Sequence, residues 1–271
     1  MRFNLIKIII TVIAAFSMTA CEISDNHQLI IKNEDLTIPA DSVKMNCFIA
    51  YSDDTSSKKP IVLIVPEWWG LDTHVKTKAN LLAELGYFAV GIDMYGNGKV
   101  ASDPATAKTY TAPFYTNPQL ALGRLQAALT KAKTYSQADT SRTAAIGYCF
   151  GGAMVLNSAR LGLPVNGVVS FHGNLSGISP VKELFKAQVL ICHGAIDQFV
   201  PAQEVATFKT QMDSLGIPYT FKEYANATHA FTNPASTENG KKFDLPIAYN
   251  EAADTASFND MRVFFKRIFE K

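Results

Sequence analysis

The sequence lacks any excess of charge of one sign. Its 271 residues include 25 Lys and Arg against 24 Asp and Glu, so the formal net charge is only +1. Proteins that bind nucleic acids usually carry a strongly basic patch, and this balance gives no sign of one. The four cysteines show none of the regular spacings of a structural metal site. We therefore expect no nucleic-acid partner, no bound metal and no cofactor.

Long apolar stretches are also absent beyond the first twenty residues, and no internal repeat or low-complexity linker interrupts the chain. At the N-terminus, Arg2 and Lys7 precede an apolar run over residues 8–16, which is the layout of an export signal. The uncharged stretch between Lys7 and Glu22 is shorter than the ~20 residues that a membrane-spanning helix needs. We therefore expect a signal peptide over residues 1–20 rather than a transmembrane helix.

The end of this signal resembles the lipobox of bacterial lipoproteins. Residues 17–20, SMTA, lead directly into Cys21, and in such proteins the cysteine is lipidated and becomes the mature N-terminus. Met18 departs from the motif, which favours Leu at that position. We expect a lipid anchor at Cys21, a polar leader over residues 21–41, and an outer-membrane lipoprotein of the bacterial cell envelope that faces the periplasm. The alternative is an ordinary cleaved signal and a soluble periplasmic or secreted protein.

If Cys21 carries a lipid, the remaining cysteines are Cys47, Cys149 and Cys192. Three is an odd number in a compartment that favours disulfides, so at least one thiol is expected to stay free. We interpret Cys47 and Cys192 as buried strand residues.

The 251 residues that remain after removal of a 20-residue signal from 271 are enough for one large domain, expected over residues 42–271. Short apolar runs alternate with amphipathic stretches, which is typical of a mostly parallel sheet with helices on both faces. We expect strands over residues 42–51, 61–65, 87–92, 143–146, 165–171, 188–192 and 219–224. Helices are expected over residues 74–85, 118–135, 151–161, 201–215 and 254–270, with a long loop over residues 94–117.

The sequence Gly147-Tyr148-Cys149-Phe150-Gly151 follows an apolar strand and opens a helix, as a nucleophile elbow does. The sharp turn strains the nucleophile, and side chains at the two glycines would clash. A helix N-terminus also favours a thiolate and a developing oxyanion. The alternative is a structural cysteine in a glycine-rich turn, since free cysteines are often small core residues.

Two later residues favour the catalytic interpretation. Asp197 follows the strand over residues 188–192, and His229 follows the strand over residues 219–224. Each alone is more simply a loop acid or a surface histidine. Together they give the chain order nucleophile, acid, histidine of α/β-hydrolases, and all three follow the carboxyl ends of strands, where open α/β sheets place their sites.

From about residue 43 to its C-terminus, the chain resembles the dienelactone hydrolase family, whose members open a lactone through a Cys-His-Asp triad. The resemblance includes the elbow and the spacings of 48 residues from Cys149 to Asp197 and of 80 residues to His229. It implies an α/β-hydrolase fold, and a hydrolase of esters or lactones that forms a thioester on Cys149.

A second signal is the segment VPEWWG at residues 65–70. The family carries a glutamate in this loop that contacts the resting thiol, and Glu67 matches it. The resemblance also assigns the oxyanion hole to the backbone N–H groups of Trp68 and Phe150. Glu67 as an ordinary loop carboxylate is the alternative.

The resemblance fails at two positions. Family members that open dienelactone hold the substrate carboxylate with two arginines, and alignment puts Asn97 and Asn233 there. An asparagine cannot form the charged, bidentate contact of an arginine. Three lysines are alternative cations, although each is more simply solvated: Lys99, Lys241 and Lys242. We therefore expect weak activity on dienelactone and better turnover of neutral or differently shaped esters or lactones.

Other interpretations remain open from the residues alone. The triad does not choose the acyl group, so a thioesterase or peptidase could use the same scaffold. A non-catalytic binding lipoprotein is a further alternative, which the full set of Glu67, Cys149, Asp197 and His229 disfavours. His172 and His193 lie near Cys192, but without the spacing of metal ligands, and we interpret both as packing residues near the pocket floor.

Overall fold

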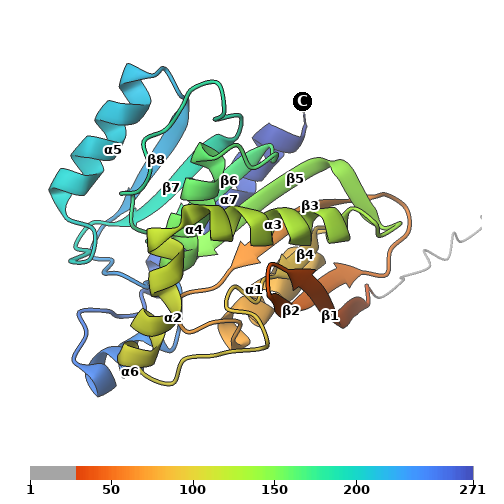
Figure 1. Ribbon diagram of the computed structural model, residues 1–271, viewed down its shortest axis with the longest axis horizontal. Helices are drawn as coiled ribbons and strands as arrows, with labels where there is room; N and C mark the ends of the chain where they lie inside the picture. Colours follow the sequence, from red (N-terminus) through yellow and green to blue (C-terminus); the bar gives the residue numbers. More distant parts are fainter. Residues whose placement is uncertain (1–28, 271) are drawn as a thin grey trace, which may run out of the picture.

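The computed structural model describes residues 29–270, which form an eight-stranded sheet with helices on both faces (Figure 1). The expected export signal and the expected lipid attachment site at Cys21 lie outside the described residues. Within those residues, no helix is long and apolar enough to cross a membrane.

The strands run in the order β1-β2-β4-β3-β5-β6-β7-β8. The pairs β1–β2 and β2–β4 are antiparallel, and every other neighbouring pair is parallel. This mostly parallel order confirms the expected α/β-hydrolase fold. The strand bounds are β1 Ile31–Ala40, β2 Val43–Ser52, β3 Lys59–Val65, β4 Phe88–Gly91, β5 Ala138–Tyr148, β6 Gly167–Phe171, β7 Gln188–Gly194 and β8 Tyr219–Tyr224.

The helices cover the sheet in two layers. Helices α3, α4 and α5 pack with one apolar cluster, and α1 and α7 pack with a second cluster on the other face. The helix bounds are α1 Thr73–Glu84, α2 Pro104–Thr116, α3 Pro118–Ala132, α4 Phe150–Arg160, α5 Ala202–Ser214, α6 Ser236–Phe243 and α7 Glu251–Phe269.

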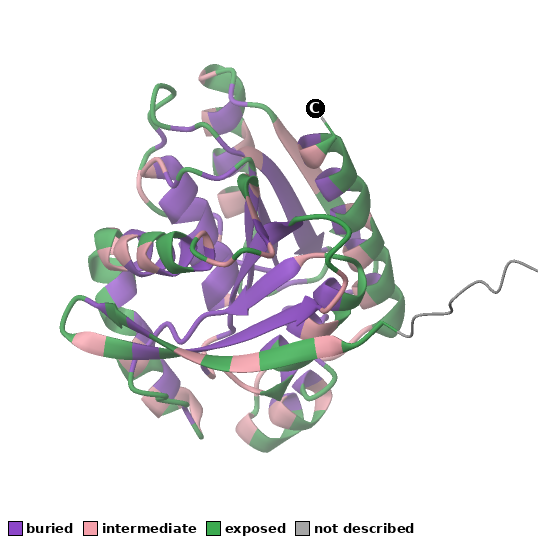
Figure 2. Ribbon diagram, turned by 90° about the vertical axis from the view of Figure 1, so that its right-hand side faces the viewer, coloured by how far each residue is buried: buried purple, intermediate pink, exposed green. Residues whose placement is uncertain are grey.

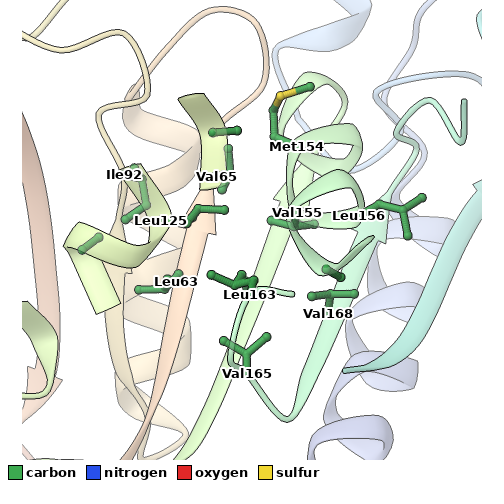
Figure 3. Packing of buried hydrophobic residues seen from close by; sticks show 14 of the residues in the cluster. Leu63, Val65, Ile92, Leu125, Met154, Val155, Leu156, Leu163, Val165 and Val168 are labelled. Carbon is green, nitrogen blue, oxygen red and sulfur yellow. The ribbon is translucent and has the colours of Figure 1, made fainter. Parts of the chain in front are cut away.

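The central strand β3 explains why the sequence shows a continuous apolar run there. All seven of its residues are buried, because helices cover both faces of the strand. Figure 3 shows Leu63 and Val65 of β3 packing near Leu125 of α3, with Val155 of α4 on the neighbouring part of the core. Burial of such a side chain contributes about 1.5–3 kcal/mol relative to its exposure to water. The sheet and its helices therefore form a rigid support for the loops at the strand ends.

Three elements differ from the sequence-based expectation. Residues 31–40, assigned to the polar leader, form the edge strand β1, in which only Ile38 and Ala40 are buried (Figure 2). A strand with one solvated edge and a solvated face carries too few apolar residues to be recognised. The expected loop over residues 94–117 contains α2, which begins at a proline and has Pro113 inside it. The short polar helix α6 was not expected either.

Candidate active site

Cys149 lies between β5 and α4, in a strained backbone conformation. Its φ of 51° and ψ of −116° make it one of the few non-glycine residues of the described chain with positive φ. Such strain persists where the surrounding structure enforces it, commonly at functional sites. The side chain is half-buried at the N-terminus of α4, whose first-turn N–H groups have no partners within the helix. This geometry agrees with the expected nucleophile elbow.

The flanking glycines allow this turn to pack closely. A Cβ on Gly147 would lie 2.1 Å from the Gly151 carbonyl oxygen, and a Cβ on Gly151 would lie 2.3 Å from the Val65 carbonyl oxygen. The start of α4 therefore packs directly against the end of β3. That contact brings the loop after β3, which carries Glu67 and Trp68, beside Cys149.

His229 and Asp197 form a buried pair beside the cysteine. His229 Nδ1 lies 2.8 Å from Asp197 Oδ2, while Asp197 Oδ1 accepts the Phe199 backbone N–H at 2.8 Å. Since Nδ1 faces the carboxylate, Nε2 is the nitrogen available to Cys149, which lines the same pocket. Burial, the largest single influence, lowers the His229 pKa, but Cys149 and Asp197 together outweigh it and raise the pKa above its usual value.

Glu67 is a carboxyl group in a nearly dry environment. It is 3% exposed, its Oε2 accepts a hydrogen bond of 2.5 Å from Asn233 Nδ2, and its Oε1 has no partner among the described residues. Burial raises the pKa of Glu67 to about 7, and the hydrogen bond from Asn233 opposes this only in part. Glu67 can therefore carry a proton near neutral pH.

These side chains meet at a pocket of about 230 Å³. Its walls are largely aromatic and aliphatic, and the residues that line it are Glu67, Trp68, Trp69, Lys108, Thr111, Tyr115, Cys149, Phe150, Asn174, Phe199, His229, Ala230, Leu245 and Ile247. The expected nucleophile, histidine and glutamate thus share one cavity, and Asp197 supports the histidine from behind. An apolar pocket with a few convergent polar groups is the usual form of a small-molecule site.

The two expected oxyanion-hole residues also line this pocket. Phe150 is the first residue of α4, where a backbone N–H has no helical acceptor. The Trp68 backbone is held in place because its carbonyl oxygen accepts the Tyr95 hydroxyl at 2.8 Å. Tyr95 was not recognised from the sequence, because it belongs to the expected loop after residue 93 and no local pattern marks it.

His172 has a larger role than the packing residue that the sequence suggested. Its Nδ1 lies 3.1 Å from the Cys149 backbone nitrogen and accepts that N–H together with the Phe171 carbonyl oxygen at 3.0 Å, and its Nε2 lies 2.8 Å from Thr232 Oγ1. Burial, with a smaller contribution from His229, holds the His172 pKa well below its usual value, so the ring is neutral. A neutral ring with Nδ1 as acceptor has its proton on Nε2, and it fixes the backbone of the elbow.

The asparagines aligned with the family's arginines lie in different places. Asn233 is buried against Glu67 at the edge of the site, as described above. Asn97 is an exposed turn residue with φ of 57°, and its side chain accepts the Lys44 backbone N–H at 3.2 Å. Its side chain therefore does not line the pocket.

The three lysines considered as replacement cations do not line the pocket either. Lys99 and Lys242 lie over aromatic rings, and Lys241 pairs with Glu238 at 2.9 Å. The cation that does line it is Lys108 of α2. The sequence offered no sign of this, because α2 lies inside a segment expected to be a loop.

Cys47, Cys192 and His193 are buried residues of the core. Cys47 and Cys192 are buried and free, as expected, and burial raises the pKa of each thiol to about 12. His193 is buried against the ring of Phe221. Among residues 29–270, no group of three or more His, Cys, Asp and Glu side chains could hold a metal ion.

The model of the dienelactone hydrolase family matches residues 45–269. The chain belongs to the dienelactone hydrolase family. A carboxymethylenebutenolidase-like relative from Methylorubrum extorquens is 30% identical over 183 residues, which cover 64% of this chain and 63% of that protein. The matched part thus spans somewhat less than two thirds of that relative.

Solved structures extend this similarity to the whole fold. A dienelactone hydrolase-like promiscuous phosphotriesterase from metagenomic libraries has a TM-score of 0.82 and 29% identity, covering 88% of this chain and 98% of that one. An α/β-hydrolase from a deep-sea metagenome of the Medee basin, at 15% identity and a TM-score of 0.64, covers 88% and 99% and supports the fold alone. The family places the chain among hydrolases that act on ester or lactone bonds.

Proposed function

We propose that this member of the dienelactone hydrolase family cleaves esters or lactones through a thioester on Cys149. The observation that carries the proposal is the arrangement of a strained cysteine at a helix N-terminus, a histidine that lines the same apolar pocket, and a buried aspartate 2.8 Å from that histidine. This is the relation of nucleophile, base and orienting acid that nucleophilic catalysis requires.

In the first step, His229 Nε2 takes the thiol proton as Cys149 Sγ attacks the substrate carbonyl. The backbone N–H groups of Trp68 and Phe150 stabilise the negative oxygen of the tetrahedral intermediate. When the intermediate collapses, the carbon–oxygen bond to the leaving alkoxide breaks, and His229 returns the proton to that oxygen. The acyl group remains on Cys149 as a thioester. In a lactone, the released hydroxyl stays attached to the acyl group.

In the second step, His229 removes a proton from water, which attacks the thioester carbonyl. Asp197 stabilises the imidazolium that forms and keeps Nε2 directed at the reacting atoms. Collapse breaks the carbon–sulfur bond, and the thiolate takes the proton back. The products are a carboxylic acid and the free enzyme.

We assign Glu67 to the resting state. In its neutral form it places no second negative charge next to the thiol, and it can donate a hydrogen bond through the Oε1 or Oε2 atom that holds the proton. A thiol that remains neutral until substrate binds is less readily oxidised than an exposed thiolate.

The substrates that fit this pocket best are neutral esters or lactones. A carboxylate would meet largely apolar walls, Asn233 already donates to Glu67, and the charged hydrogen bonds that two arginines supply, at roughly 1.5–3 kcal/mol each, are absent. Lys108 offers one exposed point charge in return. The specificity constant for a carboxylated lactone should therefore lie below that for its neutral methyl ester. A clear preference for the charged form would contradict this assignment.

The test of the mechanism is hydrolysis of nitrophenyl acetate by Cys149→Ala and by a matched control, Cys192→Ala, in which a buried cysteine on β7 is shortened in the same way. Loss of a triad member typically costs on the order of 10⁴-fold or more in turnover. Intact-mass measurement of the rapidly quenched wild type should show an acetyl group on Cys149. Residual Cys149→Ala activity above about a tenth of wild type would exclude the proposed nucleophile. A folded protein without any acyl hydrolysis would support a binding role, and turnover of acyl thioesters alone would support a thioesterase.

We also propose that Cys21 carries a lipid and anchors the enzyme to the bacterial outer membrane. The support is the sequence around residues 17–21 alone. Fractionation of cells that produce the wild type and Cys21→Ala decides this, since equal membrane association of the two would contradict the anchor.

A further inference from the structure

The end of the sheet opposite the candidate active site carries a basic and partly apolar face. The parallel strands begin there, while α2 and α6 lie at the other end of the sheet beside the site, at the lower left in Figure 1. Two grooves of about 840 and 690 Å³ open on this face, and Arg142 and Phe269 line both of them. They therefore adjoin and form one continuous surface, which we call the basic face.

Cations dominate the charge of the basic face. Lys58, Arg262 and Lys266 line the first groove, and Lys133 and Lys186 line the second. None of these five makes an ion pair among residues 29–270. Acidic groups also lie here: Glu270 lines the first groove, Asp139 pairs with Arg142 at 2.7 Å, and Asp260, which lines a neighbouring hollow with Val263, pairs with Lys222 at 3.3 Å. The face thus keeps a clear positive balance although the whole chain is close to neutral.

Apolar groups lie between these cations. Tyr87, Phe265 and Phe269 pack against one another at the first groove in tilted and edge-to-face arrangements, with ring centroids 5.3 to 6.2 Å apart. At its margin, Val263 of α7 is 70% exposed and Leu85 is 40% exposed. Cations around exposed apolar side chains match the headgroups and the acyl boundary of an anionic bilayer.

The chain enters the fold next to this face. Ile31 pairs with Ser52, and Ala50 pairs with Ala89, so the start of β1 lies at the same end of the sheet as the start of β4, with β2 between them, and Tyr87 before β4 lines the first groove. The described part of the chain, which starts at Leu29, therefore begins at this end of the sheet. The eight steps from Cys21 to Leu29 can span at most about 28 Å. Any attachment near Cys21 would hold the basic face close to the membrane.

We propose that the basic face docks on an anionic lipid surface and turns the active-site pocket away from it. Each Lys or Arg near such a surface strengthens binding about fivefold. The pocket, at the far end of the strands, stays open to water-soluble substrate. This inference is independent of the proposed hydrolysis, and also of lipidation, because the charges alone should provide binding.

The first test uses the full chain carrying Cys21→Ser, so that no lipid contributes, and vesicles of phosphatidylcholine with or without about one third phosphatidylglycerol. The variant Lys58→Glu/Arg262→Glu/Lys266→Glu should bind the anionic vesicles at least roughly 100-fold more weakly than its parent. A matched control reverses three lysines at the active-site end: Lys99, Lys108 and Lys242. The control should retain binding, and the basic-face variant should retain folding by circular dichroism and hydrolysis of nitrophenyl acetate.

The second test reports orientation. The two native tryptophans, Trp68 and Trp69, line the active-site pocket. Brominated phosphatidylglycerol should leave them unquenched, and should quench an added tryptophan in Val263→Trp. Ile196→Trp, at a residue 54% exposed in the loop before Asp197, is the matched control and should not be quenched.

Three results would overturn the proposal. The first is a lack of charge dependence: the parent and the basic-face variant bind anionic vesicles equally, or the parent binds anionic and neutral vesicles equally. Another is quenching of Ile196→Trp rather than Val263→Trp. The third is that protein covers the face. A concentration-dependent dimer that the basic-face variant loses would show that a second copy binds there. A red shift of the Val263→Trp emission on removal of residues 1–28 would show that this segment covers the face.

Discussion

The effect of Glu67→Gln on the free energy of unfolding should become more favourable as the pH rises. The pKa of Glu67 is raised by burial from its usual 4.5 to about 7 in the folded protein. Between these two pH values the folded state binds more protons at this position than the unfolded state, so ionisation favours unfolding and stability falls as pH rises. The penalty is absent well below pH 4.5, grows by about 1.4 kcal/mol per pH unit, and is complete above pH 7. Glu67→Gln removes it.

Between pH 5 and pH 8 the change in the unfolding free energy caused by Glu67→Gln should become more favourable by about 2–3 kcal/mol. Glutamine places an amide group where Oε1 has no hydrogen-bond partner among residues 29–270, at a cost of roughly 1–3 kcal/mol, but this cost is the same at both pH values and cancels in the difference. Urea unfolding of the wild type and of Glu67→Gln at the two pH values measures this difference. The dependence of the unfolding free energy on urea concentration should be the same for both proteins. Glu84→Gln, at an exposed residue of α1, is the matched control. The same effect of Glu67→Gln at pH 5 and pH 8 would refute the reasoning.

Three further predictions concern the same site. Asp197→Asn should lower turnover of nitrophenyl acetate on the order of 10⁴-fold with little change in melting temperature, because the amide favours the wrong imidazole tautomer; a loss below tenfold would contradict its role. Gly151→Ala should prevent stable folding, since its Cβ would lie 2.3 Å from the Val65 carbonyl oxygen, whereas Gly123→Ala, with no atom within 3.8 Å, should melt no lower than wild type. Asn233→Arg should raise the specificity constant for a carboxylated lactone relative to its methyl ester by tenfold or more, and an unchanged ratio would show that this position does not select substrate charge.

The central part of the fold was predictable because its sequence signals are local. The continuous apolar run in β3 follows from burial on both faces, and the glycines at 147 and 151 follow from a turn that leaves no room for side chains. The edge strand β1 was missed because its stability comes from pairing with β2 along its whole length rather than from its own apolar residues. Helix α2 was missed because its internal Pro113 and its polar turns are typical of loops.

Some residues of the site could also be predicted from the sequence, and others could not. Cys149, Asp197 and His229 each follow a strand, and the parallel order of those strands brings them to one edge of the sheet, so their proximity was predictable from spacing. The contribution of His172 was not predictable, because it depends on a hydrogen bond between a ring on the loop after β6 and a backbone N–H after β5. Lys108 reaches the pocket only because α2 lies over it. Such contacts follow from the tertiary arrangement, which no local pattern records.

The contact between Glu67 and Asn233 links two properties that looked unrelated in the sequence. An arginine at position 233 would hold a charge beside Glu67, which lowers the pKa of a carboxyl group and favours its ionised form. The neutral amide donates a hydrogen bond but no charge, so burial dominates and the pKa of Glu67 rises to about 7. The same replacement removes a cation that could bind a substrate carboxylate. Asn233→Arg should therefore lower the pKa of Glu67 and, under the proposed preference for neutral substrates, raise the relative turnover of a carboxylated lactone at the same time.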